Sequence, residues 1–491
     1  MHESLKNLPL ESLLASIPED CTIESHRLHE HTLELFVSWP EPKGSDRICP
    51  YCASADCSIK DGGTLQTLRH VGNALMGTLI TFHKPRLVCH SCGRSFYLKP
   101  EWAFPEFSCT SLLALQIFDE LTSTGKSLTM IARDTYTTPA IVTSFLDHIP
   151  YDRPKKLPVS LGIDEFKGNS GYYDPAKKRF FTEKYHCVIT DVDSGHVADV
   201  LFRATYRELH DYFMQFPLSE RRRVRFFCTD MRSGFSKVAR NCFPHARICI
   251  DMFHVVKLLT EAVSDIRIDA WRSLLKEYQA ASAAYRSAKD YGNENISVLK
   301  AEAELLKEKC SILKNSQRAL VTSPYNNDAY WSRHPDDHRE RLRKIFLLEP
   351  RLITAHNALM DFYDLMNTAK LEFHRSMLDG WLKKYLNCDC PPVRQAAYSI
   401  DRHRNGIENS WKYHKSNGST ESLNQKTKNI IRASFGIRSF EHLRKRILLA
   451  SGLTVMGLKE TYTIFGEKRG SDSETHDMPL VPSDNTGMER K

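Results

Sequence analysis

The residues best spaced for chemistry in this sequence are four cysteines near its N-terminus. The segments CPYC and CHSC each place two thiols with two residues between them. Such a knuckle turns both sulfurs toward one ion, and two knuckles complete the tetrahedral site that structural zinc prefers. Residues 53–88 exceed what a compact zinc ribbon needs, and a strand hairpin would fill them. We therefore predict a structural Zn2+ held by Cys49, Cys52, Cys89 and Cys92.

This predicted zinc site is structural because four filled positions leave no place for a reacting water. Cys57, His70 and His90 are alternative ligands, which we interpret as bystanders. The chain has 14 cysteines, and its N-terminus lacks the basic start and apolar run of a secretion signal. A reducing cytosol disfavours disulfides, so the other cysteines are predicted to fill apolar interior as free thiols.

Three acidic residues stand where divalent-metal chemistry would need them. Asp164 ends the apolar run VSLGID, Asp230 ends RRVRFFCTD, and Glu421 starts the helix expected from SNGSTESLNQKTK. Carboxylates that converge from separate elements hold hard cations such as Mg2+. Two such ions can activate the attacking oxygen and stabilise the leaving one when a phosphodiester is cut.

Each of these acids also has an ordinary structural interpretation. An acid at the end of a strand more often caps a helix or lies in a solvated turn, and Glu165, Asp191 and Asp193 are acids of the same kind. Glu165 adjoins Asp164, and neighbouring strand residues point to opposite faces, so only one of the two can join a given site. Spacing alone does not choose between them.

Several domains must position these residues, because 491 residues are too many for one compact core. The chain is 41% hydrophobic and 26% charged, which is typical of globular proteins and excludes a mainly disordered chain. No run approaches the roughly 18 apolar residues of a membrane span, so we expect a cytoplasmic protein. The formal charge of +8 permits nucleic acid as a partner without requiring it.

Residues 108–149 predict three helices. The last two, SLTMIARDTY and PAIVTSFLDHI, are short, and Pro139 suits the first turn of the final helix. Two short helices joined by a tight turn are typical of a helix-turn-helix that binds DNA. The alternative is a helical hairpin that supports a neighbouring domain.

An α/β stretch follows Pro158, with strands predicted in VSLGID, KYHCVITDV, HVADVLF, RRVRFFCTD and ARICID. From about 256 to 400 the sequence becomes helical and rich in charge. A heptad-like seam there favours a helix packed in a bundle, with a dimerising coiled coil as the alternative. The seam residues are Ile296, Leu299, Ala303, Leu306, Cys310 and Leu313.

The fold class is therefore predicted as multidomain α/β. The predicted segments are an N-terminal helix and hairpin (1–40), a zinc ribbon (41–100), a helix-turn-helix (101–150), the first part of an α/β core (151–255), an all-α insertion (256–400), the second part of the core with the glutamate helix (401–455) and a partly disordered tail (456–491).

Over about residues 40–455 the sequence resembles the transposases of the ISL-three family of bacterial insertion sequences. The resemblance runs in one order through CPYC…CHSCGRSF, the helix-turn-helix, IDEF, TDMRSGF, IDMFHVVK, and SNG–E–LN–K–K followed by FGIRSFEHLRKRIL. Any one of these motifs is modest evidence, whereas the ordered set is highly specific.

The resemblance implies a ribonuclease-H-like catalytic core with an Asp-Asp-Glu triad. By motif the triad is Asp164, Asp230 and Glu421, which would hold two catalytic Mg2+ ions, with Mn2+ able to substitute. The family also places a helical insertion before the glutamate helix, which matches the texture of residues 256–400.

Further residues are implied as supports of the active site. Asp251 and His254 match an Asp-x-x-His motif that would organise the site or grip DNA, although Asp251 could instead simply cap a helix. The family's usual sequence after the glutamate is EGLNN, whereas this chain has ESLNQ. Asn424 therefore matches the family, and Ser422 replaces its glycine. Serine lacks glycine's backbone freedom, but a helical position tolerates it.

Candidate DNA contacts come from two places. Basic residues on or after the glutamate helix suit phosphate contacts, with a solvated helix face as the alternative. The first choices are Lys426, Lys428 and Arg432, and the cluster continues with Arg438, Arg444, Lys445 and Arg446. Base-specific contacts are expected near the start of the last short helix, from Thr138, Ile141, Thr143 and Ser144.

The resemblance thus implies a transposase that binds terminal inverted repeats, cuts double-stranded DNA and joins it to target DNA. Pairing two DNA ends implies a homodimer or larger assembly. Such a protein would be bacterial, cytoplasmic and bound to the nucleoid when on DNA. The alternatives are a DNA-binding regulator that no longer cuts and a structure-selective nuclease.

Overall fold

The computed structural model describes residues 17–18, 21–40, 47–73, 75–104, 107–149, 151, 153–167, 172–174, 178–181, 185–291, 295–326, 333–368, 371–415, 429–434, 437 and 439–451. The chain divides into two compact units. The first comprises residues 1–121, 129–152 and 454–491, and the second comprises residues 122–128 and 153–453. Within the described ranges, no helix combines the length and apolar character needed to cross a bilayer. The expected mixed α/β character is confirmed.

The first unit contains one five-stranded sheet, in the order β1-β2-β4-β3 with β5 paired to β4. The expected hairpin turn near His29 lies between β1 and β2. However, β2 pairs in parallel with β4, so the hairpin and the cysteine-bearing strands share one sheet. The strands are β1 (Thr22–His29), β2 (Thr32–Ser38), β3 (Cys57–His70), β4 (Gly77–Cys89) and β5 (Ser95–Tyr97).

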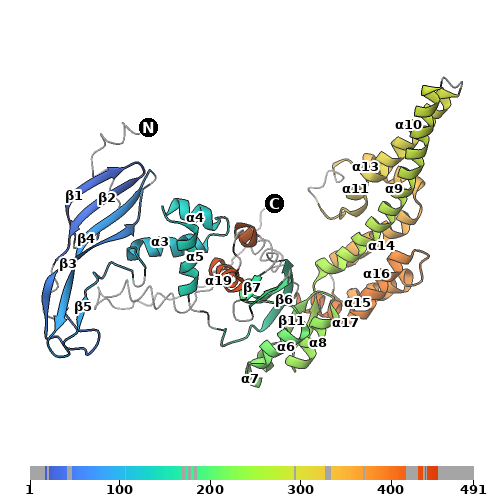
Figure 1. The fold of residues 1–491 in the computed structure, drawn as a ribbon. Helices are drawn as coiled ribbons and strands as arrows, with labels where there is room; N and C mark the ends of the chain where they lie inside the picture. Colours follow the sequence, from blue (N-terminus) through green and yellow to red (C-terminus); the bar gives the residue numbers. More distant parts are fainter. Residues whose placement is uncertain are drawn as a thin grey trace, which may run out of the picture. The chain divides into compact units, whose positions relative to one another are not determined.

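Apolar alternation explains this sharing of one sheet. Leu33 and Leu35 on β2 are fully buried and belong to the same core cluster as Ile80 and Phe82 on β4. Pairing with β2 ends at Phe82, and the far half of β4 pairs instead with β5. The long β3–β4 hairpin therefore carries its cysteine end beyond β1 and β2 (Figure 1).

Three helices follow the sheet where the sequence predicts them: α3 (Ser111–Thr122), α4 (Leu128–Asp134) and α5 (Pro139–His148). They are joined to the sheet by backbone and side-chain contacts. Thr110 donates its N–H to the carbonyl of Arg69 at 2.9 Å, and its hydroxyl lies 2.9 Å from His70 Nδ1. In the turn between α4 and α5, Tyr136 packs so closely on Gly77 that no side chain would fit there.

The second unit is built on a mixed five-stranded sheet in the order β10-β9-β6-β11-β12. Strand β9 is antiparallel to both β10 and β6, whereas β6, β11 and β12 run parallel to one another. Its strands are β6 (Ser160–Lys167), β9 (Tyr185–Asp191), β10 (His196–Leu201), β11 (Phe226–Thr229) and β12 (Arg247–Ile250), and a separate pair is β7 (Tyr172–Asp174) with β8 (Arg179–Phe181).

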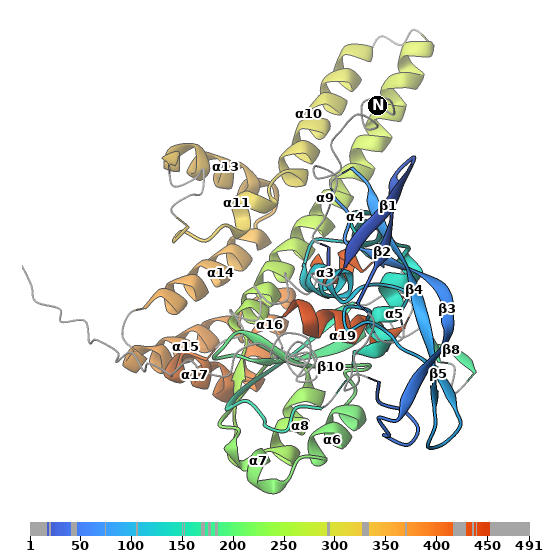
Figure 2. The same cartoon turned by 90° about the vertical axis from the view of Figure 1, so that its left-hand side faces the viewer.

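Helices cover this sheet on one face and at both edges. The helices α6 (Tyr206–Met214) and α8 (Ser233–Cys242) pack side by side against one face, with the short α7 (Leu218–Arg223) between them in sequence (Figure 2). At the β12 edge, Ser410 of α17 (Arg404–Tyr413) donates its hydroxyl to the carbonyl of Ile250 at 2.7 Å. At the β10 edge lies α19 (Phe440–Ala450).

A helical block follows β12, from α9 to α16. Its first two helices lie against each other (Figure 1), and the predicted seam faces inward, since Ala303, Cys310 and Leu313 are buried. The seam is thus covered within the chain, as the packed-bundle interpretation predicts. The helices are α9 (Met252–Asp290), α10 (Ile296–Lys314), α11 (Gln317–Val321), α13 (Pro335–Leu348), α14 (Arg351–Asn367), α15 (Leu371–Tyr385) and α16 (Pro391–Arg402).

Candidate functional site

The four predicted zinc ligands meet at the end of the β3–β4 hairpin. The Sγ atoms of Cys49 and Cys92 are 3.7 Å apart, those of Cys52 and Cys89 are 3.6 Å apart, and all four lie within 4.8 Å of one another. Four sulfurs about 2.3 Å from one tetrahedral zinc would be about 3.8 Å from each other. The donor set and its spacing therefore fit Zn2+.

Both cysteine knuckles have the same local fold. In each, the residue after the second cysteine has a positive φ and donates its N–H to the carbonyl of the first cysteine at 2.9 Å. These residues are Ala53 and Gly93. Burial raises the pKa of the Cys89 thiol, but hydrogen bonds from the Cys92 backbone and from Cys52 lower it overall to about 6. Thiolate is the form that zinc binds.

The three alternative zinc ligands are placed differently. His70 lies against Thr110, and His90 Nε2 is 2.8 Å from Ser58 Oγ. Cys57 pairs with Cys89 across the hairpin, yet it lies outside the convergent group. The structure therefore agrees with their interpretation as bystanders.

Asp164 lies on β6, and Asp230 directly follows the adjacent parallel strand β11. The register pairs Gly162 of β6 with Cys228 of β11. Continued by two residues, it sets Asp164 beside Asp230. Both side chains then point to the face away from α6 and α8, because Leu161 and Phe227 occupy the other face. The sequence correctly predicted that a strand ends just before Asp230, but β6 continues past Asp164 to Lys167, and spacing did not predict the alignment.

Asp251 joins the same edge from the next strand. Thr229 pairs with Ile250, so the register places Asp251 beside Asp230, and the Asp251 N–H donates to the Thr229 carbonyl at 2.9 Å. The Asp251 carboxylate caps α9 by accepting from Phe253 N–H at 3.1 Å, and its Oδ2 lies 3.8 Å from His254 Nε2. The capping role and the place at the acidic edge are therefore both present.

Arg232, which no sequence motif singled out, is a cation at this edge. Its Nε lies 3.1 Å from Asp230 Oδ2, and its backbone N–H donates to Asp230 Oδ1 at 2.9 Å. Its guanidinium also forms an ion pair with Glu165. Burial lowers the pKa of Arg232, but the carboxylates of Glu165, Asp230 and Asp164 raise it overall. The signal in the sequence was its position two residues after a strand-end aspartate.

The chemistry of this edge suits a divalent cation, because carboxylate oxygens are the ligands that Mg2+ prefers. Asp230 and Asp251 are 7% and 6% exposed, and a carboxylate so buried needs a positive partner. Among the described residues, however, the thiols converge within 4.8 Å and these carboxylates do not. The remaining predicted site residues, Glu421, Asn424, Lys426 and Lys428, lie outside the described ranges.

The candidate DNA-contact residues of α5 are at or near its exposed start. Thr138 is exposed and caps the helix by accepting from the Ile141 N–H at 3.3 Å. Thr143 and Ser144 are half-buried, and each hydroxyl donates at 2.7 Å to a backbone carbonyl of the helix. A hydroxyl with its proton engaged can still accept, so these side chains suit base donors better than phosphates.

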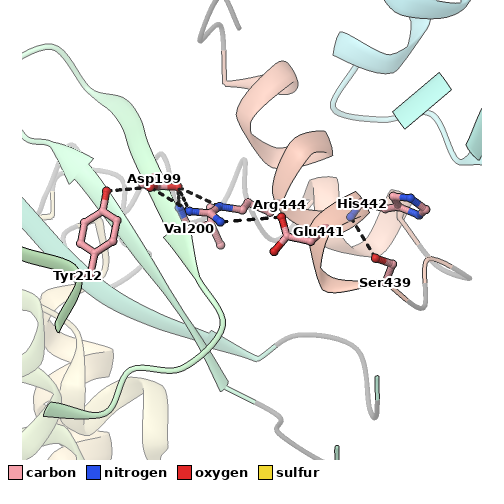
Figure 3. A network of polar contacts seen from close by, with 7 residues as sticks. All are labelled: Asp199, Val200, Tyr212, Ser439, Glu441, His442 and Arg444. Carbon is pink, nitrogen blue, oxygen red and sulfur yellow. Dashed lines mark hydrogen bonds and ion pairs between the residues drawn. The ribbon is translucent and has the colours of Figure 1, made fainter. Parts of the chain in front are cut away.

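Two arginines of the predicted basic cluster, Arg444 at 11% side-chain exposure and the buried Arg446, bind partners within the chain, which corrects their assignment to a DNA-facing surface. Arg444 binds Asp199 through Nε at 3.1 Å and Nη2 at 2.9 and 3.0 Å (Figure 3). Arg446 is 1% exposed and donates to the carbonyls of Ser123 and Lys126. Helix periodicity could not reveal these distant partners. Arg432, by contrast, is exposed.

Comparison with known proteins bears on the second unit. A family model for transposases of the ISL-three type matches residues 161–447, from β6 to α19. Transposases for the insertion sequence element IS1557 from two strains of Mycobacterium tuberculosis, CDC 1551 / Oshkosh and ATCC 25618 / H37Rv, are each 28% identical over 282 residues. These alignments cover 57% of this chain and 58% of each relative, so the chain spans little more than half of their length.

Proposed function

The chain belongs to the ISL-three family of transposases, and on that premise we propose that it is a DNA transposase that cuts and rejoins DNA at the ends of an insertion sequence. The observation that carries the proposal is the strand register. The register pairs Gly162 with Cys228 and, continued by two residues, would bring Asp164 beside Asp230, inside the part of the chain that the family model matches. The lateral neighbour Asp251 makes this edge a row of three acids.

We assign the second unit as a ribonuclease-H-like core interrupted by the helical block from α9 to α16. The support is a mixed sheet with helices on one face and acids grouped at the ends of its parallel strands. In open sheets of this kind, ligands bind at the carboxyl ends of parallel strands. The acidic edge therefore lies where a substrate would approach.

In this proposal Asp164, Asp230 and Glu421 hold two Mg2+ ions. The ions would supply activation of the attacking oxygen and stabilisation of the leaving oxygen in phosphodiester cleavage and strand transfer. Asp251 sets the start of α9 beside these acids, and His254 lies one helical turn further on, next to Asp251. Asn424 is assigned to the same supporting group.

DNA recognition is assigned to the first unit. There, α4 and α5 are joined by a short turn, and α5 exposes the start that a helix-turn-helix would present to a major groove. The Cys49–Cys92 quartet would hold the zinc that stabilises the adjoining hairpin. Phosphate contacts are assigned to Lys426, Lys428 and Arg432, and pairing of two DNA ends to a homodimer or larger assembly.

The test is excision from a donor plasmid that carries the gene between its native flanking sequences. Wild type is compared with Asp230→Asn and Glu421→Ala, with Mg2+ and with chelator, and end binding is measured in parallel by gel shift. We expect metal-dependent excision that both variants lose while they still bind the ends. Normal cutting by Glu421→Ala would refute the third acid. End binding without excision by wild type would instead indicate a regulator.

A further inference from the structure

Arg232 is placed to compete with a divalent cation for Asp230. It is the residue before α8, so its backbone is fixed at the carboxyl end of β11. From there its N–H and its Nε engage the two oxygens of the Asp230 carboxylate, at 2.9 and 3.1 Å. A carboxylate held on both oxygens by one cationic residue presents less of its charge to another cation.

Arg232 also forms an ion pair with Glu165, which it can keep when it leaves Asp230. Glu165 follows Asp164 on β6, and successive strand side chains point to opposite faces. Glu165 therefore stands off the face that carries Asp164, Asp230 and Asp251. An arginine that keeps this ion pair can release Asp230 without losing every partner.

The exposure of the two partners permits such a movement. The Arg232 side chain is 53% exposed, whereas the Asp230 side chain is 9% exposed. The long, flexible side chain borders solvent, and the carboxylate is held in place beneath it. Displacement of Arg232 from Asp230 thus requires only a rotation of the arginine side chain, with no movement of the backbone at the end of β11.

We propose that Arg232 is a positioning residue that neutralises Asp230 before metal binds and must be displaced from it when Mg2+ enters. This inference rests on the proposed function, because that function makes Asp230 a metal ligand. Arg232 then sets how much metal is needed to load the site. Arg232 also reduces the repulsion between the carboxylates of Asp230 and Glu165 in the metal-free protein.

The test is titration of the zinc-loaded full-length protein with Mn2+, followed by electron paramagnetic resonance. We expect Arg232→Gln to bind Mn2+ about fivefold more tightly than wild type, as loss of a half-exposed charge pair predicts. Without added Mn2+ the same variant should melt at a lower temperature. Arg240→Gln removes an equal charge from the exposed far end of α8 and should leave the Mn2+ affinity unchanged.

A general loss of structure would weaken Mn2+ binding, so tighter binding by Arg232→Gln separates displacement from damage. Unchanged or weaker binding by this variant, with binding lost in Asp230→Asn, overturns the role of Arg232 and leaves the metal site standing. Equal gains in Arg232→Gln and Arg240→Gln also overturn it, because net charge would then explain both. Unchanged binding in Asp230→Asn refutes the metal site and the inference together.

Discussion

The thiol cluster of the first unit and the carboxylate edge of the second are opposite kinds of candidate metal site. The four sulfurs already stand at the separations that one zinc requires, and backbone hydrogen bonds hold both knuckles. The acids lie on or directly after three adjacent strands, do not converge on one point, and include one bound by Arg232. A site that is closed in advance serves stability, whereas one that must be completed can wait for metal and substrate.

The same contrast recurs between two arginine–carboxylate pairs of the second unit. Asp199 is fully buried and receives Arg444, the Tyr212 hydroxyl at 2.7 Å and the Val200 N–H at 2.7 Å (Figure 3). Arg232, by contrast, forms ion pairs with both Glu165 and Asp230, and its side chain is half-exposed. A satisfied buried pair cannot release its cation cheaply, because an uncompensated buried charge is costly. Asp230 is also buried, but Arg232 is half-exposed and keeps Glu165 as a partner, so it can leave Asp230 when a divalent cation replaces it.

The largest effect is expected at the closed thiol site. Cys49→Ser/Cys89→Ser should reduce the zinc content from about one ion per chain to none. It should also unfold the first unit, since structural zinc contributes on the order of 10 kcal/mol. Elemental analysis and limited proteolysis measure these losses. The control is Cys57→Ser, because Cys57 is the strand partner of Cys89 but is not an assigned ligand. This variant should keep its zinc, and a zinc-free Cys57→Ser protein would contradict the assigned ligands.

A smaller loss is expected when the buried pair is broken. Arg444→Met leaves Asp199 buried without its cation and should lower the free energy of unfolding by about 3–5 kcal/mol. Urea denaturation measures it, with Arg432→Met as the exposed control, expected within about 0.5 kcal/mol of wild type. Asp199→Asn/Arg444→Met should recover part of the loss. A change below about 1 kcal/mol in Arg444→Met would show that this pair is not locked.

The smallest effect on stability is expected at the carboxylate edge of the second unit. Asp251→Asn should keep the cap of α9, because asparagine caps as well as aspartate, and unfolding should change by no more than about 0.5 kcal/mol. Asp251→Ala should lose about 1 kcal/mol. Plasmid excision should fall in both variants because both remove the carboxylate from the row of acids. Excision at the wild-type level by Asp251→Asn would show that Asp251 serves only as the cap of α9.

Local features of this fold were predictable from the sequence, but long-range ones were not. Apolar runs that end in acid marked β6 and β11, and paired cysteines marked the thiol cluster, because those signals lie within a few residues. The register that aligns Asp164 with Asp230 depends on pairing between distant strands. No local pattern encodes that pairing.

The role of individual arginines was equally hidden. Arg444 resembles its exposed neighbours in sequence, yet its partner Asp199 lies 245 residues earlier. Arg232 reads as part of a helix start, and only the neighbouring strand brings Glu165 to it. For the same reason the parallel pairing of β2 with β4, which merges the first hairpin into the cysteine-bearing sheet, was not foreseen.

The helix that Asp251 caps, α9, has the geometry of a long lever. α9 runs for 39 residues, which at 1.5 Å per residue is about 58 Å. Rotation of its axis by one degree about the first turn would carry the far end through about 1 Å. Small angular changes at the row of acids are thereby magnified into displacements at Asp290. Conversely, anything that clamps the far end fixes the angle at which Asp251 faces its neighbours.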